Sequence, residues 1–290
     1  MSTVFYRRTH ERGAFVHKIL EIFREKTADR KKIFLKPNLV SHEDYPTTTH
    51  PETLRAVLEE LADRTIIMGD AAAVDLMDAE EALRQHPLSQ LGRDLGIPLV
   101  DLYQTTQVDR TSPRGYSLKI SSLPLDCDYV ISLPILKVHL LCDITGALKN
   151  QFGYLAKEER LRLHYRPDLP PEMKEGFQLL AQSLGINTPL ESKDLAQGIA
   201  EVNAIAPAQL FIVDAVETLL QANEQRHGGT RAELGLLLAG TDPVALDCYG
   251  LKLLQEMEPK LKGKNPEDID YLRLAIAYGL GSPEFQLVEV

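Results

Sequence analysis

The sequence contains no tryptophan and only three cysteines, which lie far apart. Cys127, Cys142 and Cys248 form no CxxC pair, so the cysteines predict neither an iron–sulfur cluster nor a structural zinc site. We expect them to be reduced thiols of the protein core.

Long apolar runs and clusters of positive charge are also absent. No apolar segment reaches the length of a membrane span, and residues 1–13 lack the apolar core of a secretory signal. The formal net charge is −10, and the longest basic run is residues 30–32. We therefore expect a cytoplasmic protein that binds neither a membrane nor nucleic acid.

The common cofactor motifs are missing as well. No GxGxxG follows a strand and no GxxxxGK[ST] occurs, so the sequence predicts neither an NAD site nor an ATP site. The histidines show neither HxxxH nor HExxH spacing, which leaves no zinc-type histidine motif.

What is present is an alternation of short apolar strands with longer helical patterns, which indicates an α/β fold. We expect a Rossmann-like, mostly parallel sheet flanked by helices. The predicted strands are residues 31–38, 65–70, 97–102, 128–136, 208–216, 234–240 and 284–290. The predicted helices are residues 12–28, 50–63, 78–86, 143–155 and 242–257.

Residues 156–190 break this alternation, because they are charged and proline-rich and contain no clean strand. Long excursions of this kind within a compact domain are usually functional or disordered. We predict a helical or irregular insertion, or a lid, between residues 1–155 and 191–290, which form two halves of one α/β core.

Polar residues repeatedly follow the predicted strands. They are Lys36 with Asn38, Asp70, Lys137 with His139, Asp214, and Asp242. Ligands of open α/β sheets bind outside the carboxyl ends of the strands, so we expect these residues to converge on one site. The alternative is that they are separate caps and turn residues, and Asp242 before a proline is an ordinary helix N-cap.

Residues 135–155 place Lys137, His139, Lys149 and Asn150 among apolar residues. Lysines seldom stay buried unless they are paired. One interpretation is a set of core ion pairs with aspartates such as Asp70 or Asp214. The other is a pocket for a carboxylate or phosphate, in which His139 acts as acid/base or as a metal ligand.

The second interpretation gives an enzyme for a small anionic substrate. The catalytic residues would be His139, Lys137 and Lys149. The substrate would be bound by Lys36, Asn38, Thr48, Thr49 and Asn150, where the threonines belong to a loop that either binds an anion or only caps the next helix. Asp70, Asp214 and Asp242 would either orient His139 or hold a divalent metal such as Mg²⁺, Mn²⁺ or Zn²⁺. His164 is expected to be exposed to solvent, and the alternative is that it closes onto a ligand.

Several of these stretches occur together in a known family. "FLKPNLV", "TTTHPETLRAVLEEL", "IIMGD", "LPILKVHLLCDITGALKNQFG", "FIVDAV", "LLLAGTDPVALDCYG" and "AYGLGSPEF" follow one another from residue 31 to the C-terminus. In this order they resemble the domain-of-unknown-function 362 family. The resemblance implies an α/β fold without a settled activity. The Lys-x-His and Lys-Asn pattern is also similar to that of nickel-dependent lactate racemases, by fold-level analogy.

The resemblance also implies an alternative function. Many members of the family carry ferredoxin-like cysteine motifs, which connects the family with redox proteins, and this sequence has none. The alternative is therefore a non-catalytic module that binds a ligand, or that serves a redox protein partner in assembly or electron transfer. Such a module would bind its ligand without turnover.

Overall fold

The computed structural model describes residues 1–76, 78–166 and 168–290. Its strands are β1 (Ser2–Arg8), β2 (Lys32–Pro37), β3 (Thr65–Asp70), β4 (Leu99–Asp101), β5 (Gln107–Thr111), β6 (Ser117–Ser121), β7 (Tyr129–Leu133), β8 (Lys137–His139), β9 (Asp143–Thr145), β10 (Leu210–Leu220), β11 (Thr230–Gly240) and β12 (Phe285–Glu289). Its α-helices are α1 (Arg12–Ile22), α2 (Arg24–Thr27), α3 (Pro51–Glu60), α4 (Ala79–Gln85), α5 (Pro87–Asp94), α6 (Ala147–Asn150), α7 (Lys157–His164), α8 (Pro171–Ser183), α9 (Leu195–Ile205), α10 (Pro243–Gln255) and α11 (Asp270–Ala277).

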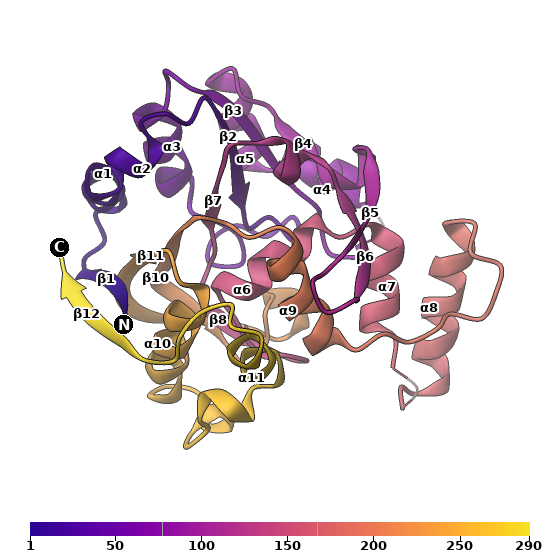
Figure 1. Cartoon of the computed structure of the whole chain (residues 1–290). Helices are drawn as coiled ribbons and strands as arrows, with labels where there is room; N and C mark the ends of the chain where they lie inside the picture. Colours follow the sequence, from indigo (N-terminus) through magenta and orange to yellow (C-terminus); the bar gives the residue numbers. More distant parts are fainter. Residues whose placement is uncertain (77, 167) are drawn as a thin grey trace.

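Eight strands form the main sheet, in the order β12-β1-β11-β10-β7-β2-β3-β4 (Figure 1). Within the described residues, five of its seven strand pairings are parallel, and only those of β11 with β1 and with β10 are antiparallel. The predicted α/β class, with a mostly parallel sheet flanked by helices, is confirmed.

Helices cover both faces of this sheet (Figure 1). One apolar cluster joins the strands to α1, α3 and α5, and the apolar residues Phe15, Val16 and Ile19 of α1 are buried in it. The other cluster joins the opposite face to α6, α9, α10 and α11. Each helix buries the apolar stripe that its 3.6-residue period produces.

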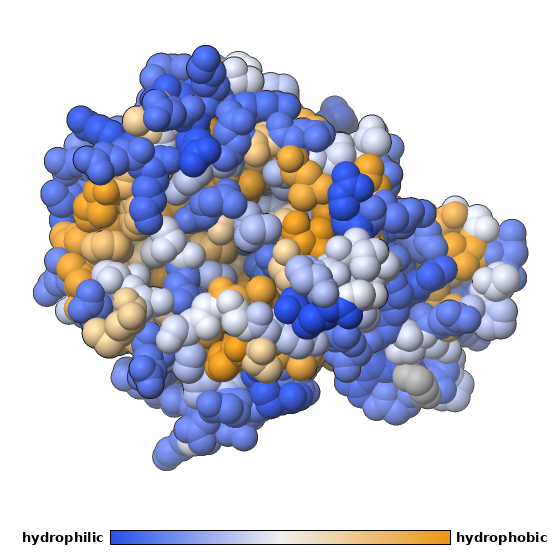
Figure 2. Space-filling model, viewed as in Figure 1, coloured by the Kyte–Doolittle hydropathy of each residue, from blue (hydrophilic) through white to orange (hydrophobic). Residues whose placement is uncertain are grey.

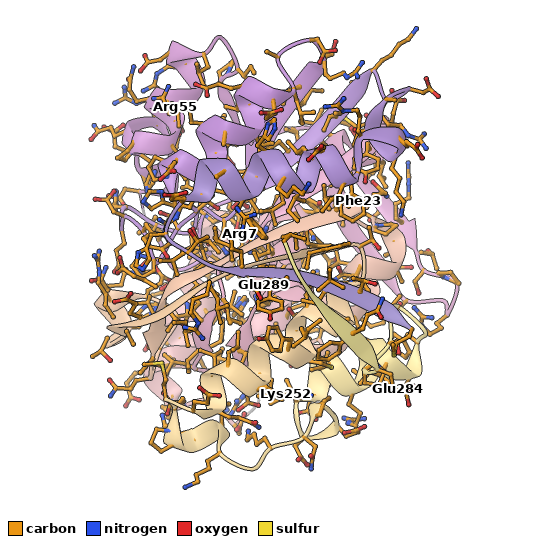
Figure 3. The ribbon with its side chains drawn as sticks, turned by 90° about the vertical axis from the view of Figure 1, so that its left-hand side faces the viewer. Arg7, Phe23, Arg55, Lys252, Glu284 and Glu289 are labelled. Atoms are coloured by element: carbon orange, nitrogen blue, oxygen red, sulfur yellow. The ribbon has the colours of Figure 1, made fainter. Side chains whose placement is uncertain are left out.

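The outer edge of the sheet brings the two ends of the chain together. β12 pairs in parallel with β1, and Val4 lies opposite Leu287. Figure 3 views this edge, where Glu289 on β12 lies near Arg7 on β1. This edge belongs to the end of the sheet that is remote from β2 and β3.

The predicted helix over residues 143–155 is wrong in its first part. The chain instead forms β9, which pairs with β8, then the short α6 and a 3-10 turn, Gln151–Tyr154. The first amide groups of α6 are bound by Asp247 of α10, which accepts hydrogen bonds from Ala147 N at 2.6 Å and Leu148 N at 3.1 Å. Gly146 leaves room for this carboxylate, because a Cβ there would collide with it.

Residues 156–190 contain two helices, α7 and α8, separated by a short connection. They are held by a small apolar cluster of their own, in which Leu161, Ala181 and Leu190 pack against Val74. α8 forms the lobe at the right of Figure 1. The segment therefore lies beside the loop that follows β3.

Candidate functional site

A cavity of about 380 Å³ opens beside the carboxyl ends of β2 and β3. Its lining combines polar and apolar residues from β2, β3, β8, α6, α7, α8 and the loop after β10. We call the buried polar part the cavity floor, and it consists of Lys36, Asn38, Asp70, Lys137, Lys149 and Asn150. We call the apolar part nearest the solvent the cavity mouth, and it consists of Leu140, Leu141, Met173 and Phe177.

One lysine of the cavity floor is already neutralised. Lys36 Nζ lies 2.6 Å from Asp70 Oδ1 and donates to the Pro37 carbonyl at 2.8 Å. Asp70 also accepts hydrogen bonds from the amides of Leu39 and Ala71. Burial lowers the pKa of Lys36, and the charge of Asp70 opposes that shift. Gly153 lies against this pair, with no space for a Cβ.

The other two lysines have no ion pair among the described residues. Lys137 Nζ donates to the carbonyl of Thr47 at 2.5 Å, and Lys149 Nζ lies 3.6 Å from the centre of the Phe152 ring. Lys137 is 1% exposed and Lys149 is 9% exposed. Burial lowers the pKa of each to about 8, because a low-dielectric environment disfavours the charged form.

His139 has its ring orientation fixed by the turn that follows β8. Its Nδ1 accepts hydrogen bonds from Leu141 N at 3.0 Å and Cys142 N at 3.3 Å. Burial, together with the charge of Lys149, lowers its pKa well below the usual value, so the ring is neutral. An accepting Nδ1 in a neutral ring leaves the proton on Nε2, and His139 is therefore a hydrogen-bond donor through Nε2.

His164 has the opposite tautomer. Its Nδ1 lies 2.7 Å from the carbonyl oxygen of Arg160, which can only accept, so Nδ1 carries the proton. Burial and the charge of Lys149 lower its pKa to about 3. His164 therefore presents a free lone pair at Nε2. We expected an exposed residue, whereas His164 is half-buried and lines the cavity.

Sequence reasoning missed Arg160, which also lines the cavity. Its guanidinium donates to the carbonyls of Ala71 and Ala72 at 3.0 and 2.9 Å. Arg160 and His164 are four residues apart on α7, so they share one helix face. That spacing was the available signal, in a segment whose charged composition favoured a solvated surface.

Of the predicted substrate-binding residues, those that line the cavity are Lys36, Asn38 and Asn150, whereas the two threonines do not. Asn38 lines the cavity, and its side-chain oxygen is buried without a partner among the described residues. Asn150 also lines it, but its amide nitrogen donates to Lys36 O and Ser132 Oγ and so joins α6 to β2 and β7.

The two threonines lie outside the cavity lining, and their hydroxyl groups bind other parts of the protein. Thr49 Oγ1 accepts from Asn38 N and donates to Leu133 O. Thr48 Oγ1 donates to the carbonyl of Glu43 at 3.1 Å. The loop that carries them contacts the cavity lining through Thr47, whose carbonyl accepts a hydrogen bond from Lys137 Nζ.

The three aspartates predicted to hold a metal are not brought together. Asp70 is at the cavity floor, but Asp214 lies in the middle of β10 and binds Arg12 at 2.6 Å. Asp242 caps α10 and accepts a hydrogen bond from Ala245 N at 2.9 Å. It follows β11, which runs antiparallel to β10, so it lies at the opposite end of the strands. Within the described residues, no three His, Cys, Asp or Glu side chains could hold a metal ion.

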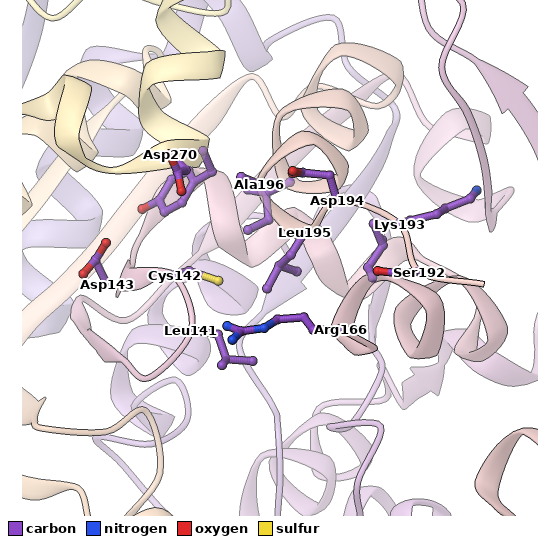
Figure 4. A pocket seen from close by; sticks show the side chains of 13 residues that line it. Leu141, Cys142, Asp143, Arg166, Ser192, Lys193, Asp194, Leu195, Ala196 and Asp270 are labelled. Atoms are coloured by element: carbon purple, nitrogen blue, oxygen red, sulfur yellow. The ribbon is translucent and has the colours of Figure 1, made fainter. Parts of the chain in front are cut away.

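A second cavity of about 250 Å³ lies near the start of α9 and of α11 (Figure 4). Its charged side chains are already used within the protein: Lys193 binds Glu159 at 2.8 Å, and Asp143 binds Lys264 at 2.6 Å. Asp194 caps α9 by accepting from Gln197 N. None of the predicted site residues lines it, so the larger cavity is the candidate site.

The family model of Domain of unknown function (DUF362) matches residues 33–252. The chain belongs to this family. The DUF362 match includes every residue that lines the larger cavity. A thylakoid-associated protein from Synechocystis sp. is 29% identical over 229 residues, which cover 77% of this chain and 63% of that relative. This DUF362 chain thus spans less than two thirds of the length of the curated relative.

The fold of this DUF362 chain is also similar to that of the lactate racemase apoprotein from Thermoanaerobacterium thermosaccharolyticum. The TM-score is 0.50 at 12% sequence identity, and the match covers 89% of this chain and 58% of the other. Similarity at this level concerns the α/β fold and carries no activity with it. In the described part of the chain, none of the helices has both the length and the apolar character that a membrane crossing needs.

Proposed function

We propose that the chain is an enzyme that binds a small carboxylate or phosphate at the cavity floor and moves a proton on it. The observation that carries this proposal is the pair Lys137 and Lys149, which are buried at a cavity with no ion pair among the described residues. A buried charge without a counter-charge is costly, and a bound anion would supply that counter-charge.

The two lysines differ in the role that their surroundings favour. Lys137 is positioned by the Thr47 carbonyl, which suits it to hold the anion. Lys149 has no hydrogen-bond partner of that kind, and its pKa of about 8 leaves roughly a tenth of the amines neutral at pH 7. A neutral lysine amine is a competent general base, so Lys149 would accept the proton and become an ammonium ion.

The two histidines complement the lysines. His139 would donate its Nε2 proton in a hydrogen bond to an oxygen of the substrate, and His164 would accept one at Nε2. This assignment moves the acid/base role from His139 to Lys149, because both amides at Nδ1 hold His139 in its donor tautomer. A metal ion at His139 Nε2 would require that proton to leave, and the proposal has no step through a metal.

The structural neighbour gives limited support. It is named a lactate racemase, and lactate is a small carboxylate of the proposed substrate class. The alternative, a non-catalytic module that binds its ligand for a redox or assembly partner, is supported by the relative that is named for its association with thylakoids.

The first experiment is calorimetric titration of the purified protein with inorganic phosphate and with acetate. We expect binding to the wild type and to Lys262→Met, a control at an exposed lysine, and at least about tenfold weaker binding to Lys137→Met and Lys149→Met, since a charged hydrogen bond contributes roughly 1.5–3 kcal/mol. Equal affinities in all four proteins, or no binding to the wild type, would overturn the proposal.

The second experiment separates the enzyme from the binding module. A panel of small carboxylic acids, including lactate, is incubated with the protein in D₂O, and exchange of carbon-bound hydrogen is followed by NMR. Exchange that requires Lys149 supports the enzyme. Binding that depends on both lysines, without exchange or product across the panel, supports the module.

A further inference from the structure

We infer that the ligand of the larger cavity is an anion with an apolar tail, such as a medium-chain or aromatic carboxylate. This inference rests on the proposed function for its charged end and goes beyond it in naming the rest of the molecule. It follows from the way in which polar and apolar residues divide the cavity.

The charged end of the ligand is set by the cavity floor. Lys137 and Lys149 are almost fully buried there and line the cavity. Lys36 contributes no net charge because Asp70 pairs with it. An anionic group therefore gains by entering as far as the floor.

The apolar end is set by the cavity mouth, where large apolar side chains are left in water. Leu140 is 54% exposed, Leu141 is 45% exposed and Met173 is 51% exposed, and all three line the cavity. They come from two separate elements, the turn after β8 and helix α8. Figure 2 shows apolar side chains also reaching the surface on the lobe that holds α8.

Exposed apolar side chains gathered in the lining of a cavity are a feature of ligand sites, because their exposure is otherwise unfavourable. The rest of the lining is mixed, and its apolar part includes Val40, Ala73, Val74 and Phe152. A chain of methylene groups or an aromatic ring would contact all of these surfaces.

The size of the cavity agrees with such a ligand. A volume of about 380 Å³ corresponds to roughly a dozen water molecules at ~30 Å³ each. Acetate or lactate would fill only the floor and leave the apolar walls wet. A longer acid displaces that water as well, and burial of each methylene contributes favourably.

Two carboxylates in the cavity lining argue against a long polyanion. Asp75 and Glu224 both line the cavity, and Arg226 bridges them at 3.0 Å and 2.8 Å. The two carboxylates outnumber the single guanidinium, and the imidazole of His227, which also lines the cavity, lies 3.3 Å from Asp75 and 3.7 Å from Glu224. A second anionic group placed beyond the floor would therefore meet negative charge, whereas an uncharged tail would not.

The test is a titration series with acetate, butanoate, hexanoate and octanoate, all below their micellar concentrations, with octanol as a probe that lacks the charge. Full burial of a methylene corresponds to a gain on the order of fourfold in affinity, so with partial burial we expect octanoate to bind at least about 30-fold more tightly than acetate. We expect octanol to bind far more weakly than octanoate.

Three variants on α8 locate the tail. We expect Met173→Ser and Phe177→Ser to weaken octanoate at least fivefold while leaving acetate unchanged. Leu179→Ser is the matched control, since Leu179 is 59% exposed on the same helix but lies outside the cavity lining.

The possible outcomes distinguish this inference from the proposed function. Acetate binding that depends on both lysines, without any gain from chain length, would refute the tail and leave the proposed function standing. Octanol binding as tightly as octanoate would refute the charged floor and with it both proposals. Equal losses in all three α8 variants would place the tail elsewhere and also refute the inference.

Discussion

Replacing Lys149 with methionine should make the protein more stable at neutral pH while weakening anion binding at least about tenfold. Lys149 is 9% exposed and has no ion pair among the described residues. Methionine has nearly the same length and no charge to bury, so it can keep the packing against Phe152. At a binding site, a substitution that stabilises the fold is expected to reduce function.

The magnitude follows from the pKa of Lys149, which burial lowers from 10.5 to about 8. Each unit corresponds to about 1.4 kcal/mol, so the ionised amine destabilises the fold by up to about 3 kcal/mol below pH 8. The penalty falls as the pH rises from 8 and disappears above 10.5, where the amine is neutral in both states. The advantage of methionine should therefore be largest at neutral pH and should shrink toward pH 10.

Urea denaturation at pH 7 and pH 10 measures this difference, with Lys262→Met as the exposed control. We expect Lys149→Met to shift the midpoint upward at pH 7, with an unchanged slope, and to lose most of that shift at pH 10. The control should move little at either pH. A lower midpoint for Lys149→Met at pH 7 would refute the reasoning, because it would mean that the ammonium group stabilises the empty fold.

Two further predictions test the separation between the site and the core. Asp214→Ala leaves Arg12 buried without its carboxylate. We therefore expect the free energy of unfolding to fall by about 3–5 kcal/mol. A loss below about 1 kcal/mol would contradict the assignment of Asp214 to the core. Acetate stays ionised above pH 6, whereas the amines of Lys137 and Lys149 lose protons around pH 8. Acetate affinity, measured by calorimetry, should therefore fall at least tenfold between pH 7 and pH 9.5. An affinity that does not change with pH would exclude these two amines as the anion site.

The residues of the cavity floor could be predicted from the sequence better than the residues that lie outside the cavity. Lys36 and Asp70 lie at the carboxyl ends of the neighbouring parallel strands β2 and β3, so their meeting could be expected from strand ends alone. Lys137 and His139 both reach the cavity because they are two residues apart on the extended backbone of β8. These expectations needed only local periodicity and the direction of the strands.

The sequence wrongly placed Asp214 and Asp242 with the other polar residues, because their positions depend on the length and the direction of their strands. β10 continues to Leu220, which leaves Asp214 inside the strand instead of at its end. β11 reverses direction, which carries Asp242 to the opposite end of the sheet. Neither property is visible in a run of apolar residues. The second half of β11 is buried on both faces, so it reads as the same continuous apolar run that parallel strands show.

The four cations around the cavity show why residue type alone does not define a site. Lys36 is cancelled by Asp70, and the guanidinium of Arg160 is held by two backbone carbonyls of the loop after β3. Among the described residues, Lys137, Lys149 and Arg160 have no carboxylate within ion-pair distance, and Arg160 is the one whose guanidinium is turned to the backbone. In a chain with a net charge of −10, such a buried positive centre attracts anions to one place. The proposed anion site therefore depends on which cations the fold leaves without a carboxylate.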